Sequence, residues 1–300
     1  MLLRYILLTL FSLIAVCASS PARAQADITY VSGSGSDANA CTFASPCQSF
    51  SGALSKTFTN GSITCISAPV TIPIAITKSV TIDCTGTGYN FVHGTVGITI
   101  SLPANDASQS VRLRGFTING FEQGTRGVEI DSGITVILED MKIIQETQQG
   151  VIDLRTAPGE LRITNTIISR NAGVGVGIAG AAGNAAILDN VTSDGNLYGV
   201  AVATGNNVTV TRSILSRNST AGVEGDGGAQ IIVDNSTISH NGTGVISASS
   251  VRISNNNIAF NTTAISGSAG TFGNNRFSAN GSFGTTLMPL GGPTSDLGQQ

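Results

Sequence analysis

Short runs of Val, Ile and Leu alternate with Thr, Ser and Asn along most of the chain, which is typical of β-strands that bury one face. In the segment that follows Gly199, such pieces fall at residues 200–202, 208–211 and 214–215. Turns built from Gly, Asn, Asp and Ser separate them. No stretch between the pieces is long enough for a crossover helix, so the pattern excludes a doubly wound α/β sheet.

A Gly-Val pair recurs along the second half of the chain and sets the repeat. Its spacings are 23, 23, 26, 23, 22 and 20 residues, starting from Gly127, Gly150, Gly173, Gly199, Gly222 and Gly244, with Ala264 in a fading seventh copy. Coils of three short strands stack when each strand pairs with the same strand of the next coil. The repeat therefore predicts a parallel β-helix with one buried valine column, formed by Val128, Val174, Val200, Val223 and Val245.

Asparagine recurs at the same period, shortly after an apolar residue. Asn tolerates the left-handed conformation that a tight corner needs, and stacked amides can hydrogen-bond from coil to coil. We therefore expect a structural ladder rather than ligand contacts, formed by Asn171, Asn196, Asn218, Asn241, Asn261 and Asn280.

Changes of pattern divide the chain into four parts. Residues 1–26 read as a signal peptide, 27–60 as an N-terminal cap, 61–283 as the β-helix and 284–300 as a loose tail. Within the cap, residues 48–58 are expected to form a short amphipathic helix that covers the first coil. Its buried stripe is predicted to be Phe50, Ala53, Leu54 and Phe58.

The N-terminal segment predicts export. Arg4 precedes an apolar run of 12 residues, Tyr5 to Val16, and small residues around Ala24 offer cleavage sites. Lipidation at Cys17 is the alternative, and the apolar run is short for a membrane span. Residues 1–26 hold two of the 15 basic residues and none of the 18 acidic ones, so the remainder has 13 basic and 18 acidic residues and a net charge of −5. A chain with 11% charged residues and no basic run does not favour nucleic acid as a partner. We expect a secreted or periplasmic protein without a membrane span, with a monomer as the simplest assembly.

Four cysteines remain after the signal segment. Four cysteines in an exported chain favour disulfides and allow three pairings. Residues Cys65 and Cys84 are 19 residues apart, about one coil, and stacked coils lie about 4.8 Å apart, within disulfide reach. We expect Cys65–Cys84, and Cys41–Cys47 around Pro46. A zinc site is the alternative, but no Cys-x-x-Cys pair or histidine cluster supports it.

Residues 35–39 (GSDAN), followed by Cys41, Pro46-Cys47 and Phe50, resemble the opening of a family of exported bacterial right-handed β-helix proteins. Residues 79–84 (SVTIDC) continue this resemblance, which extends to the pectate-lyase-like superfamily over most of the chain after the signal segment. It departs at Ala40, where proline is common. The resemblance implies export and an all-β fold, a single-stranded right-handed parallel β-helix of about ten coils with a short N-terminal capping helix. It implies no activity, because one fold hosts many functions.

The strongest candidate for a functional cluster of acidic residues is found when two successive copies of the Gly-Val repeat are aligned. Glu129 and Asp131 fall on one coil, and Asp153 and Arg155 fall on the next. If Ile152 and Leu154 point inward, Asp153 and Arg155 point outward and a catalytic or Ca²⁺ site can form. If Val151 points inward, Asp153 faces the core. A solvated charged face is the simpler interpretation.

Two classes of function remain open. The first hypothesis is a non-catalytic exported β-solenoid that binds polysaccharide or a surface partner, because the exterior is polar and carries no recognised catalytic set. The alternative is a polysaccharide lyase or hydrolase with an acidic site on the β-helix face. No cofactor is expected, and Ca²⁺ would be needed only by a lyase. A purely structural envelope or phage-derived component is a third interpretation.

Overall fold

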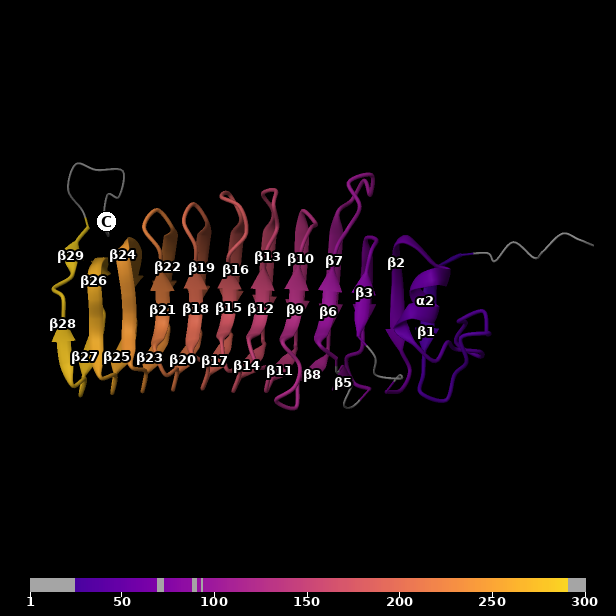
Figure 1. The fold of residues 1–300 in the computed structure, drawn as a ribbon, viewed down its shortest axis with the longest axis horizontal. Helices are drawn as coiled ribbons and strands as arrows, with labels where there is room; N and C mark the ends of the chain where they lie inside the picture. The colour runs from indigo at the N-terminus through magenta and orange to yellow at the C-terminus, as the bar shows by residue number, and fades with distance from the viewer. Residues whose placement is uncertain (1–24, 69–72, 88–90, 93, 291–300) are drawn as a thin grey trace, which may run out of the picture.

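The computed structural model describes residues 25–68, 73–87, 91–92 and 94–290, so the predicted signal peptide lies almost wholly outside the described residues. The chain winds into a stack of coils whose strands pair in parallel with the corresponding strands of the neighbouring coils (Figure 1). The third strand of the coils forms a nine-stranded sheet, close to the expected ten turns. No helix in the described part of the chain is long and apolar enough to span a membrane.

The strands form three rows along the stack. The first row contains β3 (Ile74–Ile76), β6 (Val96–Ile100), β9 (Arg126–Ile130), β12 (Gln149–Asp153), β15 (Val174–Ile178), β18 (Tyr198–Val202), β21 (Ala221–Gly225), the first parts of β24 (Thr243–Ser254) and β26 (Thr263–Gly273), and β28 (Ser282–Gly284). The second row contains β1 (Ala26–Val31), β2 (Thr57–Cys65), β4 (Val80–Asp83), β7 (Ser110–Arg114), β10 (Thr135–Glu139), β13 (Glu160–Thr164), β16 (Ala185–Asp189), β19 (Asn207–Thr211), β22 (Gln230–Asp234), the last parts of β24 and β26, and β29 (Met288–Pro289). The third row contains β5 (Phe91–Val92), β8 (Thr117–Asn119), β11 (Lys142–Ile144), β14 (Ile167–Ser169), β17 (Thr192–Asp194), β20 (Ile214–Ser216), β23 (Thr237–Ser239), β25 (Asn257–Ala259) and β27 (Arg276–Ser278).

The register of the first row corrects one part of the predicted valine column. Val151 pairs with Val176, and Val176 pairs with Val200. Val176 is fully buried, whereas Val174 is only half-buried. The motif GVGVGI contains two Gly-Val pairs, and the expected column took the first of them. The glycines of this row are needed for space, because a Cβ on Gly150 would lie 2.4 Å from Ile168 Cγ2.

Coil length varies at the corner between the first and second rows. Between β6 and β7 a long loop fills this corner, whereas β24 and β26 run through it as continuous strands. The buried residue of the first row recurs after 23, 25, 24, 23, 22 and 20 residues from Val128 to Ile265. The repeat therefore shortens toward the C-terminus because the corner loses residues, while the strands of successive coils continue to pair in parallel.

The six predicted asparagines lie one above the other at the corner that follows the third row. In each step the Oδ1 atom accepts hydrogen bonds from the backbone N–H and the Nδ2 of the preceding ladder residue, as Asn241 does from Asn218 at 2.9 and 3.0 Å. The left-handed residue at this corner is the one before the asparagine, such as Arg217 (φ 53°) or His240 (φ 58°). The expectation that the asparagines themselves adopt the left-handed conformation is therefore wrong. Their side-chain oxygens instead accept hydrogen bonds from backbone N–H groups of the preceding coil.

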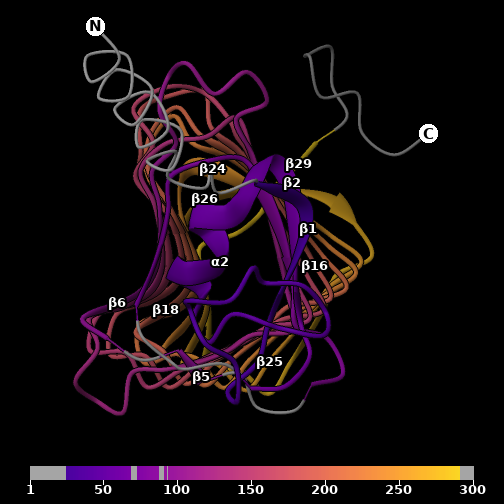
Figure 2. The ribbon, with the colours of Figure 1, turned by 90° about the vertical axis from the view of Figure 1, so that its right-hand side faces the viewer.

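The N-terminal end of the stack is covered by helix α2 (Phe50–Lys56), which lies across the opening in Figure 2. Phe50 and Ala53 are buried, and the Phe50 ring lies 5.5 Å from that of Phe116 in the core. The helix is shorter than the expected 48–58. Phe58 belongs to β2 and is 45% exposed, so its place in the buried stripe was wrong.

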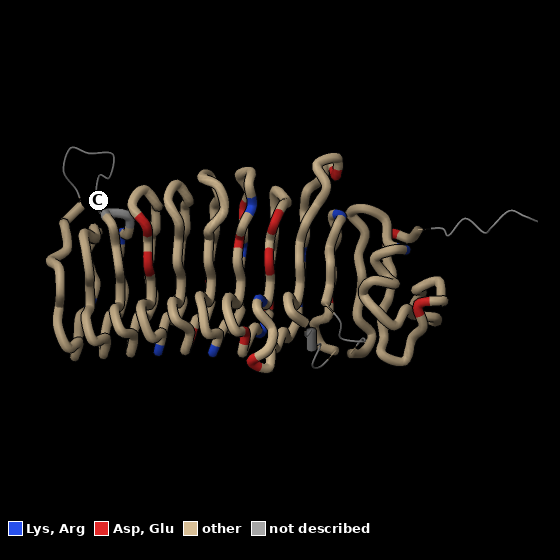
Figure 3. The backbone as a smooth tube through the Cα atoms, viewed as in Figure 1, with Lys and Arg blue, Asp and Glu red and all other residues tan. Residues whose placement is uncertain are grey.

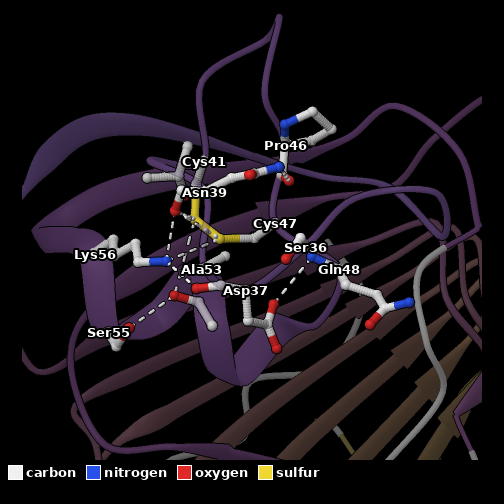
Figure 4. Close-up of a disulfide and its surroundings, with 12 residues drawn as sticks. Ser36, Asp37, Asn39, Cys41, Pro46, Cys47, Gln48, Ala53, Ser55 and Lys56 are labelled. Carbon is white, nitrogen blue, oxygen red and sulfur yellow. Dashed lines mark hydrogen bonds between the residues drawn. A yellow bond between two sulfur atoms is a disulfide. The ribbon is translucent and has the colours of Figure 1, made fainter.

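Two disulfides hold this end of the molecule. Cys65 ends β2 and Cys84 directly follows β4, the strand that pairs with β2, and their Cα atoms lie 4.7 Å apart. The second bridge, Cys41–Cys47, lies beside Lys56, whose Nζ donates to the carbonyl oxygens of Asp37 and Asn39 at 2.5 and 2.6 Å (Figure 4).

The Asp37 carboxylate orders the same region. It accepts hydrogen bonds from the backbone N–H groups of Gln48 and Ser49, both at 2.9 Å, and from the Ser49 hydroxyl. Burial alone would raise the pKa of Asp37, but these hydrogen bonds and the charge of Lys56 hold it below its usual value. Ser49 in turn caps α2 by accepting from Gly52 N. The GSDAN motif at residues 35–39 therefore has a structural role, because its aspartate orders the residues that begin the capping helix.

At the C-terminal end, residues 284–290 are more ordered than the loose tail expected there. Met288 and Pro289 form β29, which pairs with Gly270 and Thr271 of β26. Residues 291–300 lie outside the described part of the chain.

Candidate functional site

The expected acidic group splits into a half-buried, outward-facing pair and a fully buried pair. Glu129 is the outward residue of β9 and forms an ion pair with Arg126. Asp131 follows on the same face, just after the strand. Burial, and then the charge of Glu129 and a hydrogen bond with it, raise the pKa of Asp131 against the opposing pull of Arg126. The two carboxyl groups are therefore close enough for the charge of Glu129 to act on Asp131.

Asp153 and Arg155 lie in the interior instead. Val151 pairs with Val128 and Asp153 pairs with the inward residue Ile130, so the inward alternative of the sequence analysis is the correct one. Asp153 is fully buried and Arg155 is 1% exposed. The Arg155 Nε and Nη2 atoms donate to the two carboxylate oxygens of Asp153, at 2.9 and 2.5 Å.

The remaining donors of Arg155 are used within the fold. Its Nη1 donates to the carbonyl oxygens of Gly133 and Ile134, at 3.0 and 3.3 Å. Arg155 and Asp131 both line a small depression of about 180 Å³ between the loops of successive coils. Since the guanidinium is committed to Asp153 and to backbone oxygens, the geometry makes Arg155 a structural residue of this corner rather than an exposed base.

A second acidic pair lies further along the same face. Glu224 is the outward residue of β21, and Asp226 follows it. Burial, and then the charge of Asp226 and a hydrogen bond with it, raise the pKa of Glu224. In Figure 3, acidic residues lie on a few coils of this row of strands and are absent from others. The two pairs are four coils apart, roughly 19 Å at about 4.8 Å per coil.

The outward positions between these pairs are small or apolar. In register with Glu129 and Glu224 lie Ile152, Gly177 and Ala201. Within the described residues, no group of three or more His, Cys, Asp or Glu side chains is close enough to hold a metal ion. Along this register line the face therefore presents two separated carboxyl pairs with uncharged residues between them.

Two features of the structure were missed by sequence reasoning. Glu146 occupies the ladder position one coil before Asn171, and its backbone N–H donates to the Asn171 side chain. The interval from Ile143 to Glu146 matches that from Ile168 to Asn171, so the repeat contained this signal. A depression on the second row, lined by Gln230, had no signal in the repeat.

Comparison with known proteins agrees with the geometry of the coils. Residues 97–258 and 176–295 match the family described as right handed beta helix region. Among solved structures, pectate lyase Pel9A aligns with a TM-score of 0.54 and 14% identity over 88% of this chain and 78% of that one. The A-module of the Azotobacter vinelandii mannuronan C-5 epimerase AlgE4 aligns with a TM-score of 0.50 and 13% identity over 77% of this chain and 86% of that one. No curated protein matches the sequence.

At such identities the two structures support the fold and leave activity open. The family match covers more than half of the chain, and its repeats coincide with the stacked coils from β6 to β29. The chain therefore belongs to the right-handed β-helix family, and it shares the parallel β-helix fold with pectate lyase Pel9A.

Proposed function

We propose that this chain is an exported, non-catalytic β-solenoid that binds polysaccharide along its outer surface. The observation that carries the proposal is the burial of Asp153 and Arg155 in their own ion pair. The face expected to hold a catalytic group thereby loses its only candidate base and one of its three candidate acids.

The outer surface suits an extended ligand. Outward side chains repeat every coil, about 4.8 Å apart, which is close to the length of one pyranose residue in a chain. Many of them are hydroxyl or amide groups, such as Thr209, Asn207 and Gln230, which can exchange hydrogen bonds with sugar hydroxyls. The pectate lyase and the mannuronan epimerase that share this fold act on polysaccharides, which makes such a ligand a natural candidate.

Export is part of the same proposal. The N-terminal segment has the pattern of a signal peptide, and two disulfides suit a periplasmic or extracellular compartment. The expected product begins after Ala24 or Ala26, which intact-mass measurement of the secreted protein checks.

A glycan array combined with cleavage assays tests the binding function. We expect binding to at least one polysaccharide, with neither reducing ends nor unsaturated products released. Release of either product by the wild-type protein would contradict the non-catalytic assignment, and absence of binding to every glycan would contradict the ligand class.

The second candidate function is a polysaccharide lyase or hydrolase centred on Glu129 and Asp131. The observation that favours it is the outward pairing of Asp131 with Glu129, which together with burial raises the pKa of Asp131 in the direction that a general acid needs. If the wild type cleaves a polysaccharide, Asp131→Asn is expected to abolish the activity. Asp226→Asn, in the matching position of the other pair, is the control that should retain it.

A further inference from the structure

A groove of about 360 Å³ lies at the N-terminal end of the stack, between the capping helix α2 and strand β3, which begins the first row (Figure 1). Leu54 and Ile74 are buried and form its apolar part together with Ala75. Ser51 of the helix adds a hydroxyl group, and Lys78 adds a positive charge. The groove is large enough for a small molecule and offers it both apolar and polar contacts.

The ammonium group of Lys78 is held in place by the end of the helix. Its Nζ atom donates to the carbonyl oxygen of Thr57, the C-cap residue of α2, at 2.8 Å. An ammonium group has three N–H donors. The other two have no partner within the described part of the chain. Since Lys78 also lines the groove, two donors of a positioned cation are left for a ligand.

No carboxylate compensates the charge of Lys78. None of the ion pairs among the described residues involves Lys78. The described lining of the groove contains neither Asp nor Glu. Burial lowers the pKa of Lys78, whereas a neighbouring carboxylate would raise it. The fold therefore half-buries a cation that has no counter-ion of its own.

We propose that this groove binds a small molecule that carries an oxyanion, such as a carboxylate, sulfate or phosphate group. The oxyanion accepts hydrogen bonds from the two remaining donors of Lys78, and these bonds are strong because both partners are charged. The hydroxyl groups of Ser51 and Thr77, which also line the groove, bond to the polar part of the ligand. Its apolar part packs on Leu54 and Ala75. The proposal does not depend on polysaccharide binding, because the groove belongs to the cap and not to the repeated coils.

The test is an NMR titration of the full chain, produced with ¹³C-labelled lysine, with glucose 6-phosphate, glucose 6-sulfate, glucuronate and glucose at constant ionic strength. The chain has three lysines, Lys56, Lys78 and Lys142, so the Cε signal of each can be assigned by substitution. We expect at least one anionic probe to shift the Lys78 signal to saturation, and the three anions distinguish a phosphate, a sulfate and a carboxylate ligand. Glucose should bind at least about tenfold more weakly, because it offers no charged acceptor. Lys142, which is exposed on β11, should show no saturable shift.

Two variants separate the charge from the groove. Lys78→Gln keeps a donor for the Thr57 carbonyl oxygen but removes the charge, so it should weaken binding of the anionic probe at least about tenfold. Lys78→Arg should restore binding. Ala75→Leu leaves Lys78 in place and fills the groove, so it should also prevent binding. Ala201→Leu is the matched control, because Ala201 lies in the same outward register line, several coils away, and it should bind like the wild type.

Circular dichroism verifies that each variant is folded, and the wild-type titration with Ala75→Leu decides the question if Lys78→Gln does not fold. A Lys78 signal that responds to none of the anionic probes would overturn the site. Equal binding by the wild type and Lys78→Gln, or an equal response to glucose, would show that charge is not recognised and would overturn it as well. Equal binding by the wild type and Ala75→Leu would place the anion outside the groove and refute the proposal.

Discussion

Glu146 makes the stability of this protein depend on pH, and the structure gives the reason. Its carboxyl group is 2% exposed, and its Oε2 atom has no hydrogen-bond partner within the described part of the chain. Gly120 and Gly124 lie against it so closely that a Cβ on either would be 2.4 Å from Oε2. Burial raises the pKa of Glu146 from 4.5 to about 7.

The sign follows from the two states. Below pH 4.5 the Glu146 carboxyl group is protonated in both the folded and the unfolded chain, and the free energy of unfolding has its highest value with respect to this group. As the pH rises to about 7, the unfolded chain releases the proton first. The unfolded state is thereby favoured, and the free energy of unfolding falls. At about 1.4 kcal/mol per pKa unit, the loss in free energy of unfolding amounts to about 3 kcal/mol.

Replacing Glu146 by Gln removes the titration and keeps the shape. We expect Glu146→Gln to match the wild type near pH 4.5 and to exceed it by up to about 3 kcal/mol near pH 8, in urea unfolding followed by circular dichroism. Glu122→Gln, an exposed residue of the adjoining turn, is the control that should follow the wild type. Parallel pH profiles for Glu146→Gln and the wild type would refute the reasoning.

Three further predictions concern the scaffold. Asn241→Ala leaves the backbone N–H of the preceding ladder residue without an acceptor, so it should lower the free energy of unfolding by about 1–3 kcal/mol in urea titrations; an unchanged midpoint would contradict the ladder. Peptide mapping without reduction should recover a Cys65–Cys84 bridge, and replacing both cysteines by serine should lower stability by about 2–4 kcal/mol; free thiols at both positions would count against it. Asp153→Asn strands a buried guanidinium and should lower stability by about 3–5 kcal/mol, whereas Glu129→Gln on the surface should change it by less than about 1 kcal/mol; equal effects would show that Asp153 is not buried in an ion pair.

The repeat was enough to predict the architecture. A β-helix contacts itself mainly between neighbouring coils, so its period, its inward apolar residues and its ladder all leave a mark at nearly constant spacing. That is why Cys65 and Cys84, one period apart, were expected to face each other, and why the asparagines were expected in one column. The repeat predicted the wrong buried residue at Val174, because GVGVGI contains two Gly-Val pairs that fit the period. Only the strand pairing of Val176 with Val151 and Val200 shows which valine belongs to the column.

The ends of the stack were harder to predict than its middle. The stripe from Phe50 to Leu54 predicted a helix, but the apolar residue Phe58 extended it too far. The spacing of apolar residues along the chain carries no information on strand pairing. It therefore could not predict that Thr57 begins a strand that pairs with both β1 and β4. Pairing with distant strands decided where the helix stops.

The sequence by itself determined the fold class, the period and the identity of the ladder residues, because these depend on contacts that recur in every coil. Only the tertiary structure decided which way Asp153 and Arg155 point, because a shift of one residue moves a strand's side chains to the opposite face and both parities fit the local pattern. It also decided the environment of Glu146 and the grouping of Lys78 with the capping helix. These features arise at single coils, where a turn or the capping helix interrupts the repeat, and their chemistry depends on neighbours that are distant in sequence.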